Sequence, residues 1–141
     1  MSREYITKAN RGQVKNRGEN RCEYCQSPAS YATQSFVIEH IIPVSKDGSS
    51  ELDNLAWSCG GCNSFKYNKV EAFDTLSQQN VSIFNPRMQK WNKHFNWSED
   101  FFNIIGKTAT GRATIQALKM NRTGLINLRT LLKLDGKHPP N

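Results

Sequence analysis

The sequence predicts an α+β fold in which two short strands and a helix form a small unit around paired cysteines. Two Cys-x-x-Cys pairs begin at Cys22 and Cys59, a run rich in aromatic and β-branched residues precedes Pro43, and apolar residues recur at helical spacing near the C-terminus. We expect a basic arm or short helix over residues 1–20, a metal-binding domain over 21–80, and a strand and helical extension over 81–141, packed on or beside that domain.

The elements of the central domain follow one another in the order strand, loop, strand, helix. Residues 29–43 predict a strand that ends at Pro43, because proline cannot continue an interior ladder. The turn-rich segment SKDGSSELDN separates this strand from a second one that leads into Cys59. Apolar residues after Cys62 (Phe65, Val70, Phe73 and Leu76) predict a helix running through residue 76.

The C-terminal region changes character beyond residue 80. The apolar run FFNII and three tryptophans (Trp57, Trp91 and Trp97) indicate packing against the first part, with the tryptophans as core residues. Leucines at 125, 128, 131 and 132 have helical spacing. We expect the final HPPN segment, with His138, to be frayed.

Composition limits the classes of partner and compartment. The 141 residues are 37% hydrophobic and carry a formal charge of +7. This charge favours a polyanion, although a solvated basic face has the same composition. No apolar run reaches the roughly 18 residues that a membrane helix needs, and the N-terminus lacks the apolar core of a secretory signal. We therefore expect a cytoplasmic protein without a membrane partner.

The four cysteines predict a structural zinc site. Each Cys-x-x-Cys turn can direct two thiolates at one ion, and Cys22, Cys25, Cys59 and Cys62 complete a tetrahedral shell. A closed shell of four thiolates leaves no position for water or substrate, so this zinc would not be catalytic. The alternative, a pair of disulfides, fits a reducing compartment poorly.

The stretch from CEYC through IEHIIPVSKDGSSELDNLAWSCGGCNSFK resembles the HNH endonuclease family over residues 20–69. It has an acid followed by His-x-x-Pro, a turn-rich loop, Asn-Leu, and Cys-x-x-Cys with a lysine nearby. The family often has histidine where this chain has Asn63, which makes it an H-N-N variant. The resemblance implies a ββα-metal finger that hydrolyses DNA from the minor groove.

The resemblance also implies a role for each polar residue of the finger. His40 would be the general base, and Asn54 would brace the loop that holds it. Glu39 and Asn63 would bind a catalytic divalent ion, with Asn63 counted among the catalytic residues. Because both supply oxygen, we expect magnesium or manganese.

Basic residues outside this triad have two interpretations. Lys66 and Lys69, after the second cysteine pair, either reach a DNA phosphate or lie on a solvated helix face. Arg112, Arg122 and Arg129 similarly suggest either a basic stripe or ordinary exposed side chains.

The sequence thus predicts a divalent-metal-dependent DNA endonuclease with structural zinc, and DNA as its partner. A zinc-binding, nucleic-acid-binding module without cleavage activity is the alternative, and it has no need of Glu39, His40 and Asn63 together. A protein-interaction domain that uses zinc only as a staple is a third possibility.

Overall fold

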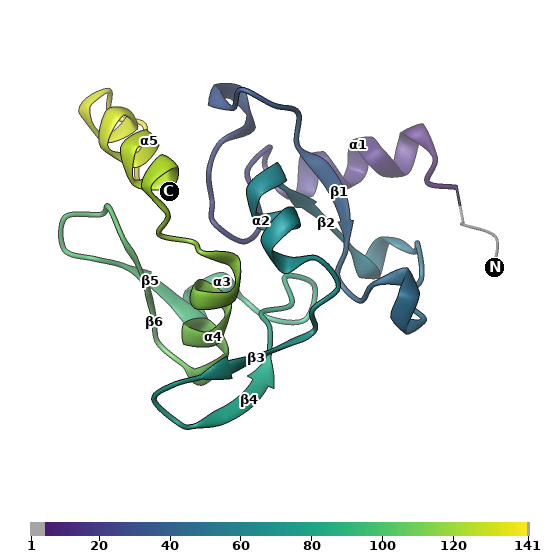
Figure 1. Cartoon of the computed structure of the whole chain (residues 1–141). Coiled ribbons are helices and arrows are strands. Elements are labelled where there is room, and N and C mark those ends of the chain that lie inside the picture. Colours follow the sequence, from purple (N-terminus) through teal and green to yellow (C-terminus); the bar gives the residue numbers. More distant parts are fainter. Residues whose placement is uncertain (1–4, 141) are drawn as a thin grey trace.

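A computed structural model of the chain describes residues 5–140, so Met1 to Glu4 of the expected basic arm lie outside the described part. The fold is α+β, with short helices and small two-stranded antiparallel sheets (Figure 1). The elements in chain order are α1 (Lys8–Arg17), η1 (Ala29–Tyr31), β1 (Val37–His40), η2 (Val44–Lys46), η3 (Leu52–Asn54), β2 (Leu55–Ser58), α2 (Gly60–Lys66), β3 (Glu71–Asp74), β4 (Gln79–Ser82), α3 (Trp91–His94), β5 (Phe95–Trp97), β6 (Ile104–Gly106), α4 (Ala109–Leu118) and α5 (Thr123–Leu134), where η marks a 3-10 turn.

The predicted strand, loop, strand and helix are β1, the η2–η3 loop, β2 and α2. Strand β1 pairs antiparallel with β2, so that Glu39 lies opposite Ala56 and His40 lies opposite Leu55. Successive side chains of a strand point to opposite faces of the sheet. Ala56 belongs to the main core beside the cysteines, whereas Leu55 belongs to a second cluster with Ile6 and Val14 of the N-terminal segment. Glu39 and His40 therefore face opposite sides.

Strand β1 is shorter than the sequence suggests. Residues 29–31 form the turn η1, and the ladder starts only at Val37. It stops at His40, before Pro43, because the Asn54 side chain bonds both backbone groups of Ile42. A side chain thus takes the place of a strand partner at this end.

The helix predicted to run through residue 76 is wrong beyond Lys66. Tyr67 adopts a positive φ of 50° and ends α2, and the following residues form the β3–β4 hairpin. Phe73 and Leu76 are largely exposed, so their helical spacing does not mark a buried face. The helix ends where a residue enters the left-handed region of φ, which an L side chain rarely adopts.

The C-terminal extension shares its core with the cysteine-containing unit. One apolar cluster contains Cys22 and Tyr24 together with Phe84, Phe95 and Leu118. The predicted C-terminal helicity is confirmed as α4 and α5, which are separated by Lys119 in a left-handed conformation. The three tryptophans pack against the same cluster, as expected. The domain boundaries at residues 20 and 80 stay predictions.

The end of the chain is not frayed as far as it is described. His138 is buried, and its Nε2 lies 2.7 Å from the Phe101 carbonyl oxygen. Its ring packs edge-on against Trp97, with ring centroids 4.6 Å apart. The expectation of a loose HPPN tail was wrong for His138, because the Phe101 carbonyl oxygen and Trp97 contact its imidazole. Asn141 lies outside the described part of the chain. Within residues 5–140, none of the helices has both the length and the apolar character needed to cross a bilayer.

Candidate functional site

The four cysteines meet at one point in the core. Their Sγ atoms all lie within 4.8 Å of one another, although the pairs are more than 30 residues apart in the sequence. Each cysteine is buried and none forms a disulfide. Even Cys25 and Cys59, whose sulfurs are 3.8 Å apart, are well beyond the bond length of about 2 Å that a disulfide requires.

Local backbone geometry prepares the sulfurs to act as thiolates. The Cys25 amide donates to Cys22 Sγ and the Cys62 amide donates to Cys59 Sγ, each over 3.4 Å. Each bond closes a four-residue Cys-x-x-Cys turn, and the second also caps the start of α2. These donors favour negative charge on sulfur. Four buried thiols of this arrangement suit a tetrahedral metal ion.

Burial also opposes free thiolates in this cluster. It raises the pKa of the Cys22 thiol well above its ordinary value, because a thiolate loses its hydration in the core. A cation among the sulfurs would supply the missing stabilisation and release the protons. The chemistry of the donor set therefore fits a bound metal better than four protonated thiols.

A residue from the C-terminal extension completes the surroundings of the sulfurs. Arg122 donates from Nη2 to Cys59 Sγ over 3.4 Å and from Nη1 to Cys62 Sγ over 3.7 Å. The same guanidinium bonds the Leu118 carbonyl oxygen. A Cβ added to Gly61 would come within 2.4 Å of Arg122 Nη2, so the glycine makes room for the arginine. Sequence reasoning missed this contact because 60 residues separate Arg122 from Cys62.

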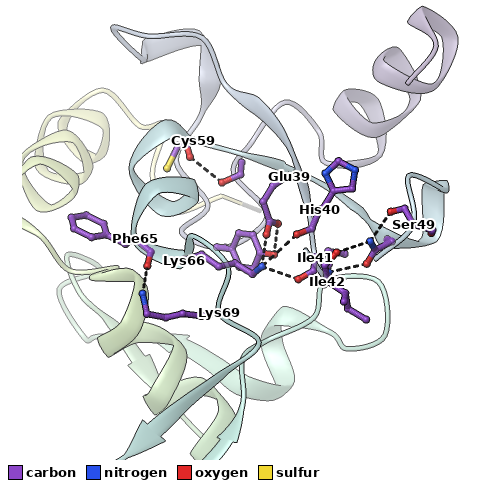
Figure 2. Close-up of polar contacts among 12 residues, drawn as sticks. Glu39, His40, Ile41, Ile42, Ser49, Cys59, Phe65, Lys66 and Lys69 are labelled. Carbon is purple, nitrogen blue, oxygen red and sulfur yellow. Dashed lines mark hydrogen bonds and ion pairs between the residues drawn. The ribbon is translucent and has the colours of Figure 1, made fainter. Parts of the chain in front are cut away.

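His40, the predicted base, is half-buried at the end of β1. Its Nε2 lies 2.9 Å from the hydroxyl oxygen of Ser50, which belongs to the loop before β2. This contact orients the imidazole ring. Figure 2 shows the ring pointing away from the Glu39 carboxylate, as strand alternation requires.

Asn54, the predicted brace, is 8% exposed and uses its amide fully. Its Oδ1 accepts from the Ile42 amide over 2.9 Å. Its Nδ2 donates to the carbonyl oxygens of Ile42 and Ser49, over 3.0 and 2.7 Å. The Asn54 side chain thus ties the segment directly after His40 to the loop directly before Ser50, on both sides of the imidazole.

Glu39 is held in a buried ion pair. It is 4% exposed, and its Oε1 lies 2.5 Å from Lys66 Nζ. Its Oε2 accepts from the Tyr24 hydroxyl over 2.7 Å. Burial raises the pKa of the Glu39 carboxyl, while Lys66 and Tyr24 act in the opposite direction. Sequence reasoning missed Tyr24, although it lies inside the first cysteine pair.

Lys66 is only 1% exposed and does not fit the predicted contact with DNA phosphate. Besides Glu39, its ammonium donates to the Ile41 carbonyl oxygen over 2.8 Å (Figure 2). Lys66 thus pairs with Oε1 of Glu39, the residue that the family resemblance expects to bind a divalent ion, while the Tyr24 hydroxyl donates to Oε2. The reason is that α2 packs directly on β1, so a side chain from its last turn reaches the strand.

Lys69 and Asn63 have more accessible positions. Lys69 is exposed beyond the end of α2, and its Nζ donates to the Phe65 carbonyl oxygen over 3.0 Å. Asn63 is half-buried in α2, one turn before Lys66, and residues three apart share a helix face. Their predicted contacts with phosphate and with a divalent ion stay predictions.

The three C-terminal arginines do not form a basic stripe. Arg112 pairs with Asp74 of β3, with Nη2 and Oδ2 2.9 Å apart. Arg129 is buried and donates to the Met120 carbonyl oxygen over 2.7 Å. With Arg122 at the sulfurs, each guanidinium has a partner within the fold, so these three arginines do not present a phosphate-binding stripe.

Comparison with known families agrees with this geometry. Residues 22–69 match the family model described as HNH endonuclease. This segment of the chain is an HNH domain. No curated protein and no solved structure matches the chain. The matched range begins at Cys22 and includes the other three cysteines, His40, Asn54 and Lys66, so the HNH domain contains the whole β1–β2–α2 unit and both halves of the cysteine cluster.

Proposed function

We propose that the HNH domain hydrolyses phosphodiester bonds of DNA, with His40 as the general base. The observation that carries this proposal is the fixation of the His40 segment by Asn54, whose three hydrogen bonds serve no other evident purpose than holding this loop. A general base must be held in one geometry to take a proton from water in line with the scissile bond. The match to the HNH endonuclease family supports the same activity.

We propose that the cysteine cluster holds a structural zinc. Four buried sulfurs and backbone donors suit this ion, and the closed shell excludes a catalytic role for it. The zinc would fix the start of α2 against the first cysteine turn, and thereby the sheet from which His40 projects.

We further propose that magnesium or manganese supports cleavage. A divalent cation stabilises charge that develops on the phosphate and the leaving oxygen. Glu39 and Asn63 supply ligands of the right type, but the Lys66 ammonium already neutralises Glu39. A cation could bind Glu39 only if Lys66 moved aside.

The experiment that tests the activity is plasmid cleavage in magnesium or manganese by the wild type and by His40→Ala. His94→Ala is the matched control, because His94 is also half-buried but lies outside the HNH domain, with Nδ1 2.7 Å from the Thr108 hydroxyl oxygen. Zinc content and circular dichroism should agree among the three proteins. We expect cleavage by the wild type and His94→Ala and its loss in His40→Ala; equal cleavage by all three would contradict the assignment.

The Glu39–Lys66 ion pair also favours a second candidate, a zinc-binding module that binds DNA without cutting it. An acidic ligand neutralised by an internal ammonium has little attraction for a metal ion. DNA binding without cleavage, in each of Mg²⁺ and Mn²⁺, is the result that this candidate predicts.

Removing Lys66 tests whether its ammonium competes with the cation. We expect Lys66→Met to bind Mn²⁺ more tightly in calorimetry, because Glu39 loses its internal partner. Since an unpaired buried charge destabilises the fold, the double variant Glu39→Gln, Lys66→Met serves as control: it lacks both charges and should not bind Mn²⁺. If Lys66→Met folds, as judged by circular dichroism, and binds no more Mn²⁺ than the wild type, Glu39 is not a metal ligand.

A further inference from the structure

A groove of about 500 Å³ lies between α1 and the beginning of β1. One wall is made by Lys8, Arg11, Gly12 and Lys15 of α1, and the other by Phe36, Val37, Ile38 and Trp57. Among residues 5–140, no acidic side chain lines the groove. None of the residues proposed for the cleavage chemistry lines it either, so its basic wall has no role in that chemistry.

The three cations of this groove form one stripe along the helix. Lys8, Arg11 and Lys15 are spaced by three and four residues, which places them on one face of α1. All three are exposed, and no salt bridge found within residues 5–140 involves them. Helix α1 also contains no acidic residue. A stripe of unpaired cations is attractive to a polyanion.

The spacing suits a nucleic acid strand. From Lys8 to Lys15 the helix rises by about 10 Å, which is roughly three phosphate steps of a DNA strand along its axis. Gly12 lies within this stripe, and a Cβ added there would meet nothing within 4 Å. Glycine weakens a helix, and no packing explains its presence here. Its missing side chain leaves the helix backbone open to close approach.

The groove opens onto the same face of the sheet as His40. Ile38, in the groove wall, and His40 are two residues apart in β1, so both point to one face, at about 7 Å from each other along the strand. Helix α1 packs on this face. Leu55, the strand partner of His40, lies in one apolar cluster with Val14 of α1. Figure 1 shows α1 beside the β1–β2 pair.

We infer that the groove between α1 and β1 binds the sugar-phosphate backbone of DNA and directs the strand toward His40. Lys8, Arg11 and Lys15 contact successive phosphates, and the apolar wall at Phe36 and Ile38 contacts the sugars. Such contacts position the duplex and carry no sequence information. The direction of the strand toward His40 rests on the proposed nuclease function, whereas binding in the groove does not.

The test is DNA binding by the full chain at several salt concentrations, measured by fluorescence anisotropy with a labelled 20-base-pair duplex. A His40→Ala background, with zinc present and without magnesium, prevents cleavage during the measurement. The variant is Lys8→Gln, Arg11→Gln, Lys15→Gln, since glutamine removes the charge and retains helix propensity. The matched control removes three exposed lysines of the C-terminal extension: Lys90→Gln, Lys93→Gln, Lys107→Gln.

We expect the α1 variant to bind more weakly and to lower the slope of log Kd against log salt by about 0.9 for each lost phosphate contact, about 2.7 in all. The control should change the slope by less than about 0.9, the value of one phosphate contact. Equal effects of the two triple variants, or an unchanged slope in the α1 variant, would overturn the inference. Gly12→Glu places an opposite charge in the groove, and its Cβ meets nothing within 4 Å. This variant should also weaken binding, and unaltered binding would contradict the inference.

The outcome for cleavage is separate. If the wild type binds DNA through α1 and cuts no plasmid, the groove stands and the endonuclease proposal fails. If the wild type cuts DNA and the α1 variant binds with an unchanged slope, the endonuclease proposal stands and the groove inference fails.

Discussion

At the scale of single residues, the HNH domain depends on side chains whose partners are distant in the sequence. Asn54 bonds the backbone of Ile42 and of Ser49, on either side of the His40 ring. Tyr24 and Lys66 hold the Glu39 carboxylate. Arg122 reaches the cysteine sulfurs from the C-terminal extension. In each case a buried polar group is satisfied by a defined partner, which fixes the geometry around it.

Arg122 should strengthen metal binding at the cysteines, because its guanidinium stabilises negative charge on Cys59 and Cys62. We expect Arg122→Gln to bind zinc about 10-fold or more weakly, a usual effect of losing a group that bonds to a metal ligand. Zinc transfer to a chromogenic chelator measures this.

The glycines of the second cysteine pair provide the matched controls for Arg122. Gly61→Ala would push the guanidinium away without removing its charge, and should also speed zinc transfer. Gly60→Ala should not, since the nearest atom to its new Cβ is Gln34 Oε1 at 3.7 Å. Equal transfer rates for both alanine variants would show that Arg122 has no influence on the metal.

The pKa of His138 should be lower than that of an exposed histidine. Burial lowers the pKa of its imidazole; the hydrogen bond to the Phe101 carbonyl oxygen opposes this effect, and the nearby cations Arg129, Arg21 and Lys133 add to it. The unfolded chain has the higher pKa, about 6.5, so it gains the proton first as the pH falls. The free energy of unfolding is therefore unaffected by His138 above that pH and decreases below it.

Ring-proton chemical shifts between pH 8 and pH 5 measure this titration. The His138 signal, assigned by its loss in His138→Gln, should have its midpoint below 6.5. A midpoint above that value would mean that burial does not dominate the pKa of His138, and would contradict this prediction.

At the scale of elements, the sequence was most reliable where two kinds of signal coincided. The β1–β2 pair lies between the two cysteine pairs and around turn-forming residues, and α2 starts inside the second pair; these elements were predicted. The helix expected to continue to residue 76 rested on apolar spacing alone. It ends at Tyr67, and the β3–β4 hairpin that follows instead packs against α4, through the ion pair of Asp74 and Arg112.

A buried threonine joins the end of this hairpin region to α4. Thr114 Oγ1 accepts from the Phe84 amide over 2.9 Å and donates to the Thr110 carbonyl oxygen. Thr114→Val would preserve the shape but leave the Phe84 amide unsatisfied in the core, so we expect a loss of about 1–3 kcal/mol in the free energy of unfolding.

Denaturant titration measures this loss. Thr130→Val in α5 is the control, because Thr130 only donates to the Ile126 carbonyl oxygen of its own helix and strands no backbone donor when it is removed. A loss in Thr114→Val no larger than in Thr130→Val would show that the Phe84 amide finds another partner.

At the scale of the whole molecule, the cysteine cluster lies in the centre of a shared core. The main apolar cluster includes all four cysteines, Phe84 and Phe95 of the middle of the chain, and Leu118 and Leu125 of the C-terminal helices. A protein of 141 residues buries a modest core, and a metal in its middle adds folding free energy directly.

Removal of the metal should therefore destabilise both halves together. We expect a chelator to lower the melting temperature strongly and to increase amide hydrogen exchange in α4 and α5 as well as in the HNH domain, with zinc restoring both. An α5 that stays protected after metal removal would show that the extension folds independently.

The sequence alone determined the kinds of group present and their local geometry: two cysteine turns, an acid-histidine pair on a strand, an asparagine in a turn-rich loop, and a basic N-terminal arm or short helix. Such features depend on spacing over a few residues, where backbone geometry fixes which side chains share a turn or a face. The family resemblance over residues 20–69 rests on these local features, as does the match over 22–69.

Only the tertiary structure decided which of these groups have partners. Lys66 is in an ion pair and not at a surface, Arg122 is at the sulfurs and not in a basic stripe, and Lys8, Arg11 and Lys15 line a groove on the His40 face. The charge of a side chain is written in the sequence. Whether that charge is neutralised inside the fold or is available to a ligand depends on packing between segments far apart in the chain, for which spacing gives no signal.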